Sequence, residues 1–409
     1  MSLVGKYRAI DAGCARVIRL ALACLVVAAC AVPKSTAIAF VDATVVTGGA
    51  PTPHQTVVVD GDRIVSVGAE APAGATVIRA TGKFLVPGFY DMHVHLPETM
   101  TDIDRVLDLS LANGITTIRG MQGKPSHLEA RKRARVQPDL VLAGPPIRDA
   151  LTPEQAKALV DEQKAAGYDL IKLLGGIDRA AYDALVAEAA AQQIPLVGHV
   201  PQEIGIDAAL AAKQHTIEHV QGYARDDDAA LADQVKRTIA AGIWNCPTLD
   251  FYTVALGPHD HLEQRDGMQY ATDAERTPPT SQPDADRLAK VKHVLAALHA
   301  GGAPLLVGSD TPDSFAVPGF GYVEELRDLV GAGLTPADAL RAATENAAAS
   351  LGRPGDGKIV AGAHADLVLL DRDPLVAIDN VAHPAGVMVR GHWLARAQLD
   401  ALLAAHARR

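Results

Sequence analysis

Apolar runs and amphipathic stretches alternate along the middle of the chain. Stretches with helical periodicity at 153–166, 180–192, 227–241 and 284–300 separate short apolar runs of strand type. Continuous apolar strands between amphipathic helices are typical of a parallel sheet that is buried on both faces. The eight runs of strand type occupy residues 84–90, 116–119, 139–143, 169–174, 194–199, 216–219, 242–247 and 303–310.

Eight such units within about 230 residues predict a (β/α)8 barrel, the TIM-barrel fold of the α/β class. The structural alternative is an open doubly wound sheet, but the sequence lacks the Gly-rich phosphate loop that such sheets often carry after their first strand. One connection differs from the others, because residues 248–283 form a long, mixed, Pro-containing segment after the seventh strand. Long loops of this kind often line a binding site, and the βα loops of a barrel surround its active-site face.

Both ends of the chain, once the first thirty residues are set aside, show strand-like runs separated by turns. Asp60-Gly61 stands between two of these runs and is a hairpin signal. We therefore expect β structure at both ends, with alternating strands and helices between them. The terminal runs lie at 39–46, 56–59, 63–67, 75–78, 357–359, 365–370 and 387–390.

The first residues have the layout of a secretory signal, in which basic residues precede an apolar run and then small residues. The apolar run 20–29 is too short to remain as a membrane-spanning helix, and it ends in VAAC at 27–30, which resembles a bacterial lipobox. We expect residues 1–29 to be a signal peptide and Cys30 to carry a lipid; cleavage without lipid attachment is the alternative. The expected location is the bacterial periplasm or the outer membrane, with membrane contact only through Cys30.

Composition and charge exclude several classes of protein. With 48% hydrophobic and 21% charged residues, the chain has a globular composition, which argues against disorder, collagen and coiled coil. A formal net charge of −10 argues against a nucleic-acid partner. Cleavage would leave Cys246 as the one cysteine inside the fold, so no disulfide framework is expected. A monomer and a homodimer both agree with these properties.

Histidines and other polar residues stand at the ends of several predicted strands. The segment 87–95 reads PGFYDMHVH, and two histidines at positions i and i+2 of a strand project from the same face. Because the carboxyl ends of barrel strands meet at one mouth, we expect these side chains to converge there. Imidazole and carboxylate together suit Zn²⁺ and related ions. The strand-end residues are His93, His95, Lys172, His199, His219 and Asp310.

Five further segments accompany these residues. They read GKFLVPG at 82–88, GITTIR at 114–119, ATENA at 343–347, GKI at 357–359 and GAHADLV at 362–368. With the strand-end residues, they resemble the amidohydrolase superfamily, and within it the imidazolonepropionase-like metal-dependent hydrolases. The resemblance covers nearly all of the mature chain. It implies a TIM barrel at 85–353 and a small β-sandwich domain formed from both termini, at 37–84 and 354–409.

The resemblance also implies a centre of two divalent metal ions, with Zn²⁺ as the expected metal. Lys172 would bridge the ions after its amine takes up carbon dioxide, because the resulting carbamate is an anionic oxygen ligand whereas an ammonium repels metals. An ion pair of Lys172 beside a single metal ion is the alternative. The implied ligands are His93, His95 and Asp310 for one ion and His199 and His219 for the other.

The mechanism implied by this centre uses hydroxide generated on the metal ions, since bound metal lowers the pKa of water to about 7. Asp310 would take the proton of the nucleophile and pass it to the leaving group. Tyr223 is a candidate donor to the substrate carbonyl, with loop packing as its alternative. Arg119 is a candidate for binding a substrate carboxylate, with a structural ion pair as its alternative.

Among members of the superfamily, a lysine on the fourth strand resembles prolidase-type dipeptidases and N-acyl amino acid hydrolases. We therefore predict an exported hydrolase of a small amide or peptide substrate, of the dipeptide or N-acyl amino acid type. The alternatives are a lactonase or ester hydrolase, or a cyclic-amide hydrolase, on the same metal centre. A metal-holding binding lipoprotein without turnover is the remote alternative, from a different class of protein.

Overall fold

The structure is a computed structural model, and it describes residues 36–48, 50–68 and 70–408. The predicted signal peptide and Cys30 lie outside these residues and stay predictions. Within the described part of the chain, no helix is both long and apolar enough to cross a membrane.

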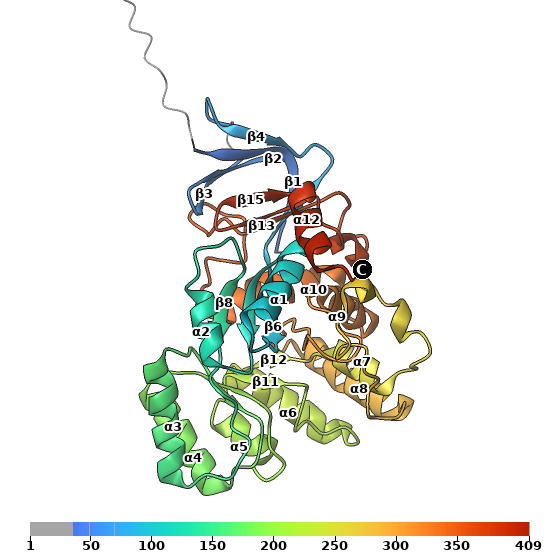
Figure 1. The fold of residues 1–409 in the computed structure, drawn as a ribbon. Coiled ribbons are helices and arrows are strands. Elements are labelled where there is room, and N and C mark those ends of the chain that lie inside the picture. The colour runs from blue at the N-terminus through green and yellow to red at the C-terminus, as the bar shows by residue number, and fades with distance from the viewer. Residues whose placement is uncertain (1–35, 49, 69, 409) are drawn as a thin grey trace, which may run out of the picture. The chain divides into compact units, whose positions relative to one another are not determined.

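The two ends of the described chain build one connected sheet of eight strands (Figure 1). Its strand order is β15-β14-β13-β5-β1-β2-β3, and β4 pairs with β1 in parallel. The junction between the two ends is the antiparallel pair of β5 and β13, in which Val86 lies opposite Val368. The strands are β1 Ile38–Thr47, β2 Ala50–Asp60, β3 Arg63–Val67, β4 Thr76–Arg79, β5 Phe84–Pro87, β13 Leu367–Leu370, β14 Gly386–Val389 and β15 His392–Ala395.

Local sequence explains the hairpin of β2 and β3. Asp60 lies opposite Arg63, and Gly61 between them has a φ of 57°, a left-handed conformation that glycine adopts without strain. The sandwich prediction is not confirmed, because the described strands of both ends hydrogen-bond into this single connected sheet. The strand expected at 357–359 is absent from the described chain, where Gly357 and Lys358 form a bend and Ile359 has no regular structure.

Seven parallel strands follow in the middle of the chain, in two sheets with the orders β6-β7-β8 and β12-β11-β10-β9. Single parallel bridges from Ala143 to Leu170 and from Asn245 to Leu305 join further segments to these sheets. The α/β class is therefore confirmed. The strands are β6 Phe89–Val94, β7 Ile115–Gly120, β8 Asp139–Leu142, β9 Ile171–Leu173, β10 Leu196–Gly198, β11 Thr216–Glu218 and β12 Trp244–Cys246.

The segment 303–310, predicted as the eighth barrel strand, forms no regular strand and has a single bridge residue, Leu305. Its backbone nevertheless bonds to both neighbours: Leu306 N donates to Asn245 O at 2.8 Å, and Asp310 N donates to His93 O at 2.8 Å. The ladder is interrupted on each side, so the structure contains no continuous ring of strands among the described residues.

Helices lie against these strands and bury one apolar face each. In α8, Val291, Val294, Leu295 and Leu298 recur at helical spacing and are buried in the same core cluster as Leu305. Helix α3 was predicted with its observed bounds. The helices are α1 Met100–Ala112, α2 Pro125–Arg131, α3 Pro153–Ala166, α4 Arg179–Ala191, α5 Gly205–Ala211, α6 Asp228–Ala241, α7 Leu249–Leu256, α8 Ala285–Gly301, α9 Phe320–Gly331, α10 Pro336–Arg341, α11 Ala347–Ser350 and α12 Arg396–His406.

The segment 248–283 is more regular than the predicted loop, because it begins with helix α7 and contains two short 3₁₀ turns. An ion pair fastens it to helix α1, because Arg105 of α1 lies 2.6 Å from Glu275. A second ion pair is internal to the segment, where Arg265 lies 2.6 Å from the buried Asp250 of α7. The irregular part of the segment is therefore tied both to α1 and to the helix with which the segment begins.

Candidate metal centre

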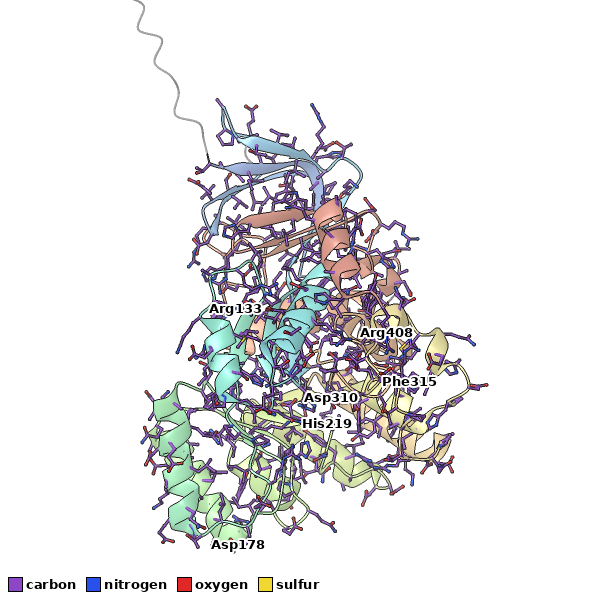
Figure 2. All side chains as sticks on the ribbon, viewed as in Figure 1. Arg133, Asp178, His219, Asp310, Phe315 and Arg408 are labelled. Carbon is purple, nitrogen blue, oxygen red and sulfur yellow. The ribbon has the colours of Figure 1, made fainter. Side chains whose placement is uncertain are left out.

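The predicted strand-end residues line one cavity of about 240 Å³, the central cavity. His93 lies near the end of β6 and Lys172 lies on β9, whereas His199 and His219 directly follow β10 and β11. Figure 2 shows His219 next to Asp310 within the protein, while Asp178 at the start of α4 lies far from them. The cavity is lined by His93, His95, Gln122, Arg148, Lys172, Leu174, His199, His219, Gln221, Phe251, Tyr252, Asp310 and Asp313.

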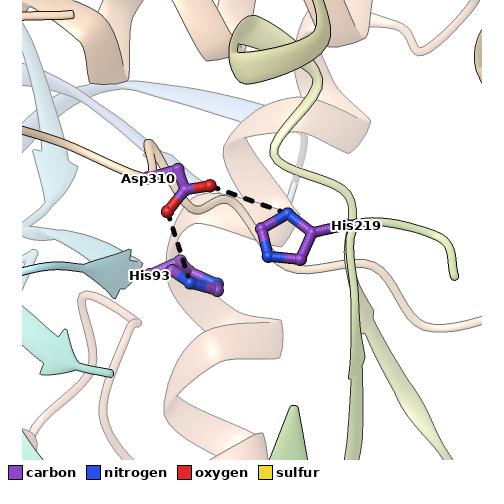
Figure 3. Close-up of side chains that lie close together, drawn as sticks. All are labelled: His93, His219 and Asp310. Carbon is purple, nitrogen blue, oxygen red and sulfur yellow. Dashed lines mark ion pairs between the residues drawn. The ribbon is translucent and has the colours of Figure 1, made fainter. Parts of the chain in front are cut away.

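The Asp310 carboxylate lies at the centre of the histidines. Its Oδ1 is 3.4 Å from His93 Nε2, and its Oδ2 is 3.6 Å from His219 Nδ1 (Figure 3). The same Oδ1 is 3.2 Å from His95 Nε2. The ring of His199 lies 4.9 Å from that of His219, measured between centroids. The ligand atoms of His93, His219 and Asp310 all lie within 4.8 Å of one another, a spacing at which they could hold one metal ion.

Three buried polar atoms of this group have no hydrogen-bond partner among the described residues: His93 Nε2, Lys172 Nζ and Asp310 Oδ1. The Lys172 side chain is 1% exposed, and a buried ammonium or amine without a partner is costly. All three atoms belong to residues that line the central cavity. Unpartnered nitrogen and oxygen atoms around one small cavity fit a divalent metal ion. These residues therefore suit the metal centre that the sequence resemblance implies.

Burial sets the protonation of these side chains. Burial, and after it the charge of Lys172, lowers the pKa of His95 to about 3 and that of His199 to about 4. The pKa values of His93 and His219 are also well below the ordinary value, again mainly through burial. Neutral imidazole is the form that binds a metal. Burial likewise lowers the pKa of the Lys172 amine, which favours the unprotonated form that reacts with carbon dioxide.

Glu218 is a functional candidate that the sequence analysis missed. Its Oε2 lies 2.8 Å from His93 Nδ1, and because a carboxylate only accepts, Nδ1 carries the proton and donates. This tautomer directs the free Nε2 of His93 toward the central cavity. Carboxylates in this position orient metal-binding histidines and raise their basicity. The feature of the sequence that could have identified it is a glutamate directly before His219, in the run TIEH at 216–219.

The structure contradicts the predicted substrate contact of Arg119. Its side chain is 1% exposed, and Nη2 donates to both carboxylate oxygens of Glu218, at 2.8 and 3.0 Å. Its Nε donates to the carbonyl of Met92 at 2.5 Å. Arg119 does not line the central cavity, so its guanidinium holds the carboxylate that orients His93 and is not free for a substrate.

The structure also contradicts the role of Tyr223 as a donor to substrate. Its hydroxyl is buried, donates to Asn245 Oδ1 at 2.8 Å and lies 2.9 Å from Thr238 Oγ1. The φ angles of His219 and Val220 are 60° and 43°, so the chain turns sharply after β11. Tyr223 therefore packs against α6 and β12 instead of facing the cavity.

Two of the candidate ligands have strained backbones. Left-handed φ angles of 60° at His219 and 57° at Asp310 are uncommon for residues other than glycine. Asp91 supports the second of them, because its carboxylate accepts from Ser309 N at 2.9 Å and from Ser309 Oγ at 2.5 Å. Such strain persists where the surrounding structure fixes it, and it gathers at functional sites.

Comparison with known proteins agrees with this geometry. The model of the amidohydrolase family matches residues 84–394. An imidazolonepropionase of Streptomyces griseus is 28% identical over 388 residues, which cover 82% of this chain and 90% of that protein. An adenine deaminase of Rhizobium etli is 27% identical over 340 residues, covering 76% of this chain, which spans about half of that longer protein (49%).

Solved structures of similar fold include two above 25% identity. The bottromycin amidohydrolase superposes with a TM-score of 0.72 at 28% identity, covering 90% of both chains. A candidate prolidase of Bifidobacterium longum superposes with a TM-score of 0.71 at 26% identity, covering 91% of this chain and all of that one (100%). These neighbours indicate that the middle of the chain has a TIM-barrel-like α/β fold.

Proposed function

Because the chain belongs to the amidohydrolase family and is therefore a hydrolase of carbon–nitrogen bonds, we propose that its substrate is a dipeptide or an N-acyl amino acid. The observation that carries this proposal is the set of strand-end side chains that line the central cavity, among them Lys172 with its buried, unpartnered amine. An amine buried in this way among neutral histidines calls for an anionic partner or for conversion into one.

We assign two metal ions to this ring, with Zn²⁺ as the proposed metal. Lys172, converted by carbon dioxide into a carbamate, would contact both ions. Bound divalent ions would polarise the substrate carbonyl and make a water nucleophilic at neutral pH. The proposed ligands are His93, His95 and Asp310 for one ion and His199 and His219 for the other.

Asp310 has the position and the environment of a general base. Its carboxylate reaches three of the histidines, and burial raises its pKa, so that it accepts a proton more readily than an exposed aspartate. In the proposed reaction, the oxygen of water bonds to the amide carbon and the carbon–nitrogen bond breaks. Asp310 takes one proton from the water and delivers it to the departing nitrogen, so that a carboxylic acid and an amine are formed.

We further propose that the segment 303–310 acts as the eighth strand of a closed barrel. The support is its backbone bonding to β12 on one side and to β6 on the other, together with the parallel bridge between Val94 and Thr311. Closure in this position brings Asp310 to the same mouth as His93. The terminal residues 1–29 and Cys30 belong to the proposal as an export signal and lipid site.

A cyclic amide is the second candidate substrate. It is favoured by the similarity to imidazolonepropionase, which extends over 82% of the chain. A panel of N-acyl amino acids, dipeptides and cyclic amides distinguishes the two candidates. We expect turnover of the open-chain compounds, and turnover of cyclic amides alone would support the second candidate instead.

The metal centre is tested by elemental analysis and by substitution of the lysine. We expect two equivalents of metal per chain, hydrolysis that requires them, and loss of both metal and activity in Lys172→Ala. Short carboxylic acids added to this variant should restore part of both, because they supply the missing oxygen ligand. Lys164→Ala, an exposed lysine of α3, is the matched control. A Lys172→Ala protein that keeps two metal ions and full activity would refute the assignment.

A further inference from the structure

A second cavity, of about 270 Å³, lies beside the central cavity and shares Phe251, Asp310 and Asp313 with it. We call it the α7 cavity, because helix α7 supplies much of its wall. Apart from the shared residues, its apolar lining comes from Val254, Ala255, Pro279 and Ala316. Shared lining residues mean that a molecule held at the metal ligands can extend into this apolar space.

The wall of the α7 cavity is fixed by internal bonds. Ser281 Oγ donates to the carbonyl of Ala255 at 2.6 Å, which ties the end of the segment 248–283 to its helix. At the start of α7, Asp250 N donates to the buried Glu325 at 2.7 Å, and the Asp250 carboxylate pairs with Arg265. The apolar space is therefore already formed before any ligand binds, as is usual for small-molecule sites.

A positively charged residue, Arg148, also lines the central cavity. Arg148 follows Ile147, whose backbone is bridged to Leu173 of β9, and a Cβ on Gly176 would lie 2.0 Å from the Arg148 carbonyl. The backbone that carries Arg148 is thus packed tightly against the loop after β9. Arg148 lines the central cavity together with His95 and His199, and its positive charge contributes to the lowered pKa of both histidines.

The guanidinium of Arg148 has no hydrogen bond or ion pair within the described part of the chain. Arg225, which lines a separate pocket together with His199, differs in this respect because it is hydrogen-bonded to Tyr252. Arginine binds carboxylates through two parallel N–H bonds, and such charge-assisted bonds are among the strongest in proteins. Arg148 is an exposed residue that lines the same cavity as the candidate metal ligands, so its unpaired guanidinium is suited to a carboxylate of the substrate.

We propose that the substrate has a free carboxylate, bound by Arg148, on the amine side of the scissile amide, and an apolar acyl group that occupies the α7 cavity. The inference rests on the proposed function and narrows its substrate class. Arg148 lines the central cavity but not the α7 cavity, whereas Asp310 and Phe251 line both cavities. Apolar N-acyl amino acids, and dipeptides with an apolar first residue, satisfy both requirements.

The kinetic test compares three compounds that differ in one feature each: N-hexanoyl-glycine, its glycinamide counterpart and N-acetyl-glycine. We expect Arg148→Met to lower kcat/KM for N-hexanoyl-glycine by about 10- to 100-fold, because KM rises. The value of kcat/KM for the glycinamide counterpart should stay unchanged. Arg148→Lys should restore part of the loss. Arg179→Met, which removes an exposed arginine of α4, is the matched control. An equal loss for acid and amide would overturn the role of Arg148.

Ala255→Trp tests the apolar side, because the larger side chain fills the α7 cavity. We expect it to lower kcat/KM for N-hexanoyl-glycine by about tenfold and to leave kcat/KM for N-acetyl-glycine unchanged. The same loss for both compounds would overturn the assignment of the acyl group to this cavity. The two variants thus examine the two halves of the inference separately.

A binding measurement separates failure of this inference from failure of the proposed function. The ketomethylene analogue of N-hexanoyl-glycine, in which CH2 replaces the amide NH, resists hydrolysis, and its affinity is measured by calorimetry. Weaker binding to Arg148→Met, by about 10-fold or more, supports the inference even if no amide is hydrolysed, in which case the proposed function alone fails. Equal binding to both proteins overturns the inference even if amides are hydrolysed.

Discussion

The Arg119–Glu218 pair should dominate the stability of the region beneath the candidate metal centre. Both side chains are almost completely buried, at 1% and 0% exposure, so water screens neither charge. Burial by itself raises the pKa of Glu218, yet Arg119 and the other nearby cations hold it below its ordinary value. Arg119 is the largest of the influences that favour the ionised form of Glu218.

Substitution Arg119→Met keeps most of the side-chain volume but leaves the Glu218 carboxylate buried without its guanidinium partner. Removing one partner of a buried ion pair costs about 3–5 kcal/mol. The free energy of unfolding of a whole domain is only about 5–15 kcal/mol, so this is a large share of it. We expect the variant to unfold at clearly lower denaturant concentration than the wild type.

The assay is urea unfolding of the metal-free protein, followed by circular dichroism and by intrinsic fluorescence to confirm a single transition. Arg179→Met is the control, because its partner Asp183 and Arg179 itself are both exposed, and an exposed pair contributes only about 0–1 kcal/mol. The double variant Arg119→Met with Glu218→Gln should recover part of the loss, since no buried charge is then left unpaired.

Glu218→Gln by itself should act on metal binding more than on folding. A glutamine keeps the shape of the side chain and can accept from His93, but it lacks the charge that strengthens the imidazole as a ligand. Metal affinity is expected to fall by about 10- to 100-fold. A cost of less than about 1 kcal/mol for Arg119→Met, together with unchanged metal affinity of Glu218→Gln, would refute the orienting role of this pair.

Three further changes test the surroundings of the site. Ser309→Ala removes the hydrogen bond from the serine hydroxyl to the buried Asp91 and should lower the free energy of unfolding in urea by about 1–3 kcal/mol. An unchanged free energy of unfolding would contradict the idea that Asp91 and Ser309 support the strained backbone beside them. Asp310→Asn should lower kcat by about 100- to 10,000-fold with an unchanged circular dichroism spectrum, and near wild-type turnover would contradict the assigned base. Arg265→Met leaves Asp250 buried and unpaired, and should expose the segment 248–283 to limited proteolysis.

The order of strands and helices could be predicted from apolar periodicity, whereas membership of a sheet could not. The run 84–90 is continuous in hydrophobicity, but the structure divides it at Gly88 between β5 of the terminal sheet and β6 of the central strands. Which neighbour each half meets is decided by backbone hydrogen bonds to distant segments, such as that from Gly88 N to Asp366 O at 2.8 Å. A pattern along one strand contains no information about such a partner.

The strand-end rule located six residues around one cavity because it uses a property of the whole fold: the carboxyl ends of parallel strands meet. It failed for Arg119, because this residue lies within β7 and its partner Glu218 is 99 positions away. It failed for Tyr223 because left-handed residues turn the chain away from the mouth after β11. Both errors concern the direction of a side chain, which depends on register and backbone conformation.

Backbone conformation also explains how the chain holds the candidate metal ligands in place. Left-handed conformations at His219 and Asp310 turn these side chains toward the cavity at the point where an ordinary strand would continue. The conformations are unfavourable by themselves and need support from buried partners. Thr248 Oγ1 lies 2.6 Å from His219 Nδ1, and Asp91 holds Ser309 beside Asp310. The buried polar network around the candidate ligands therefore supplies the rigidity that a metal site requires, and its loss should reduce metal affinity before it unfolds the protein.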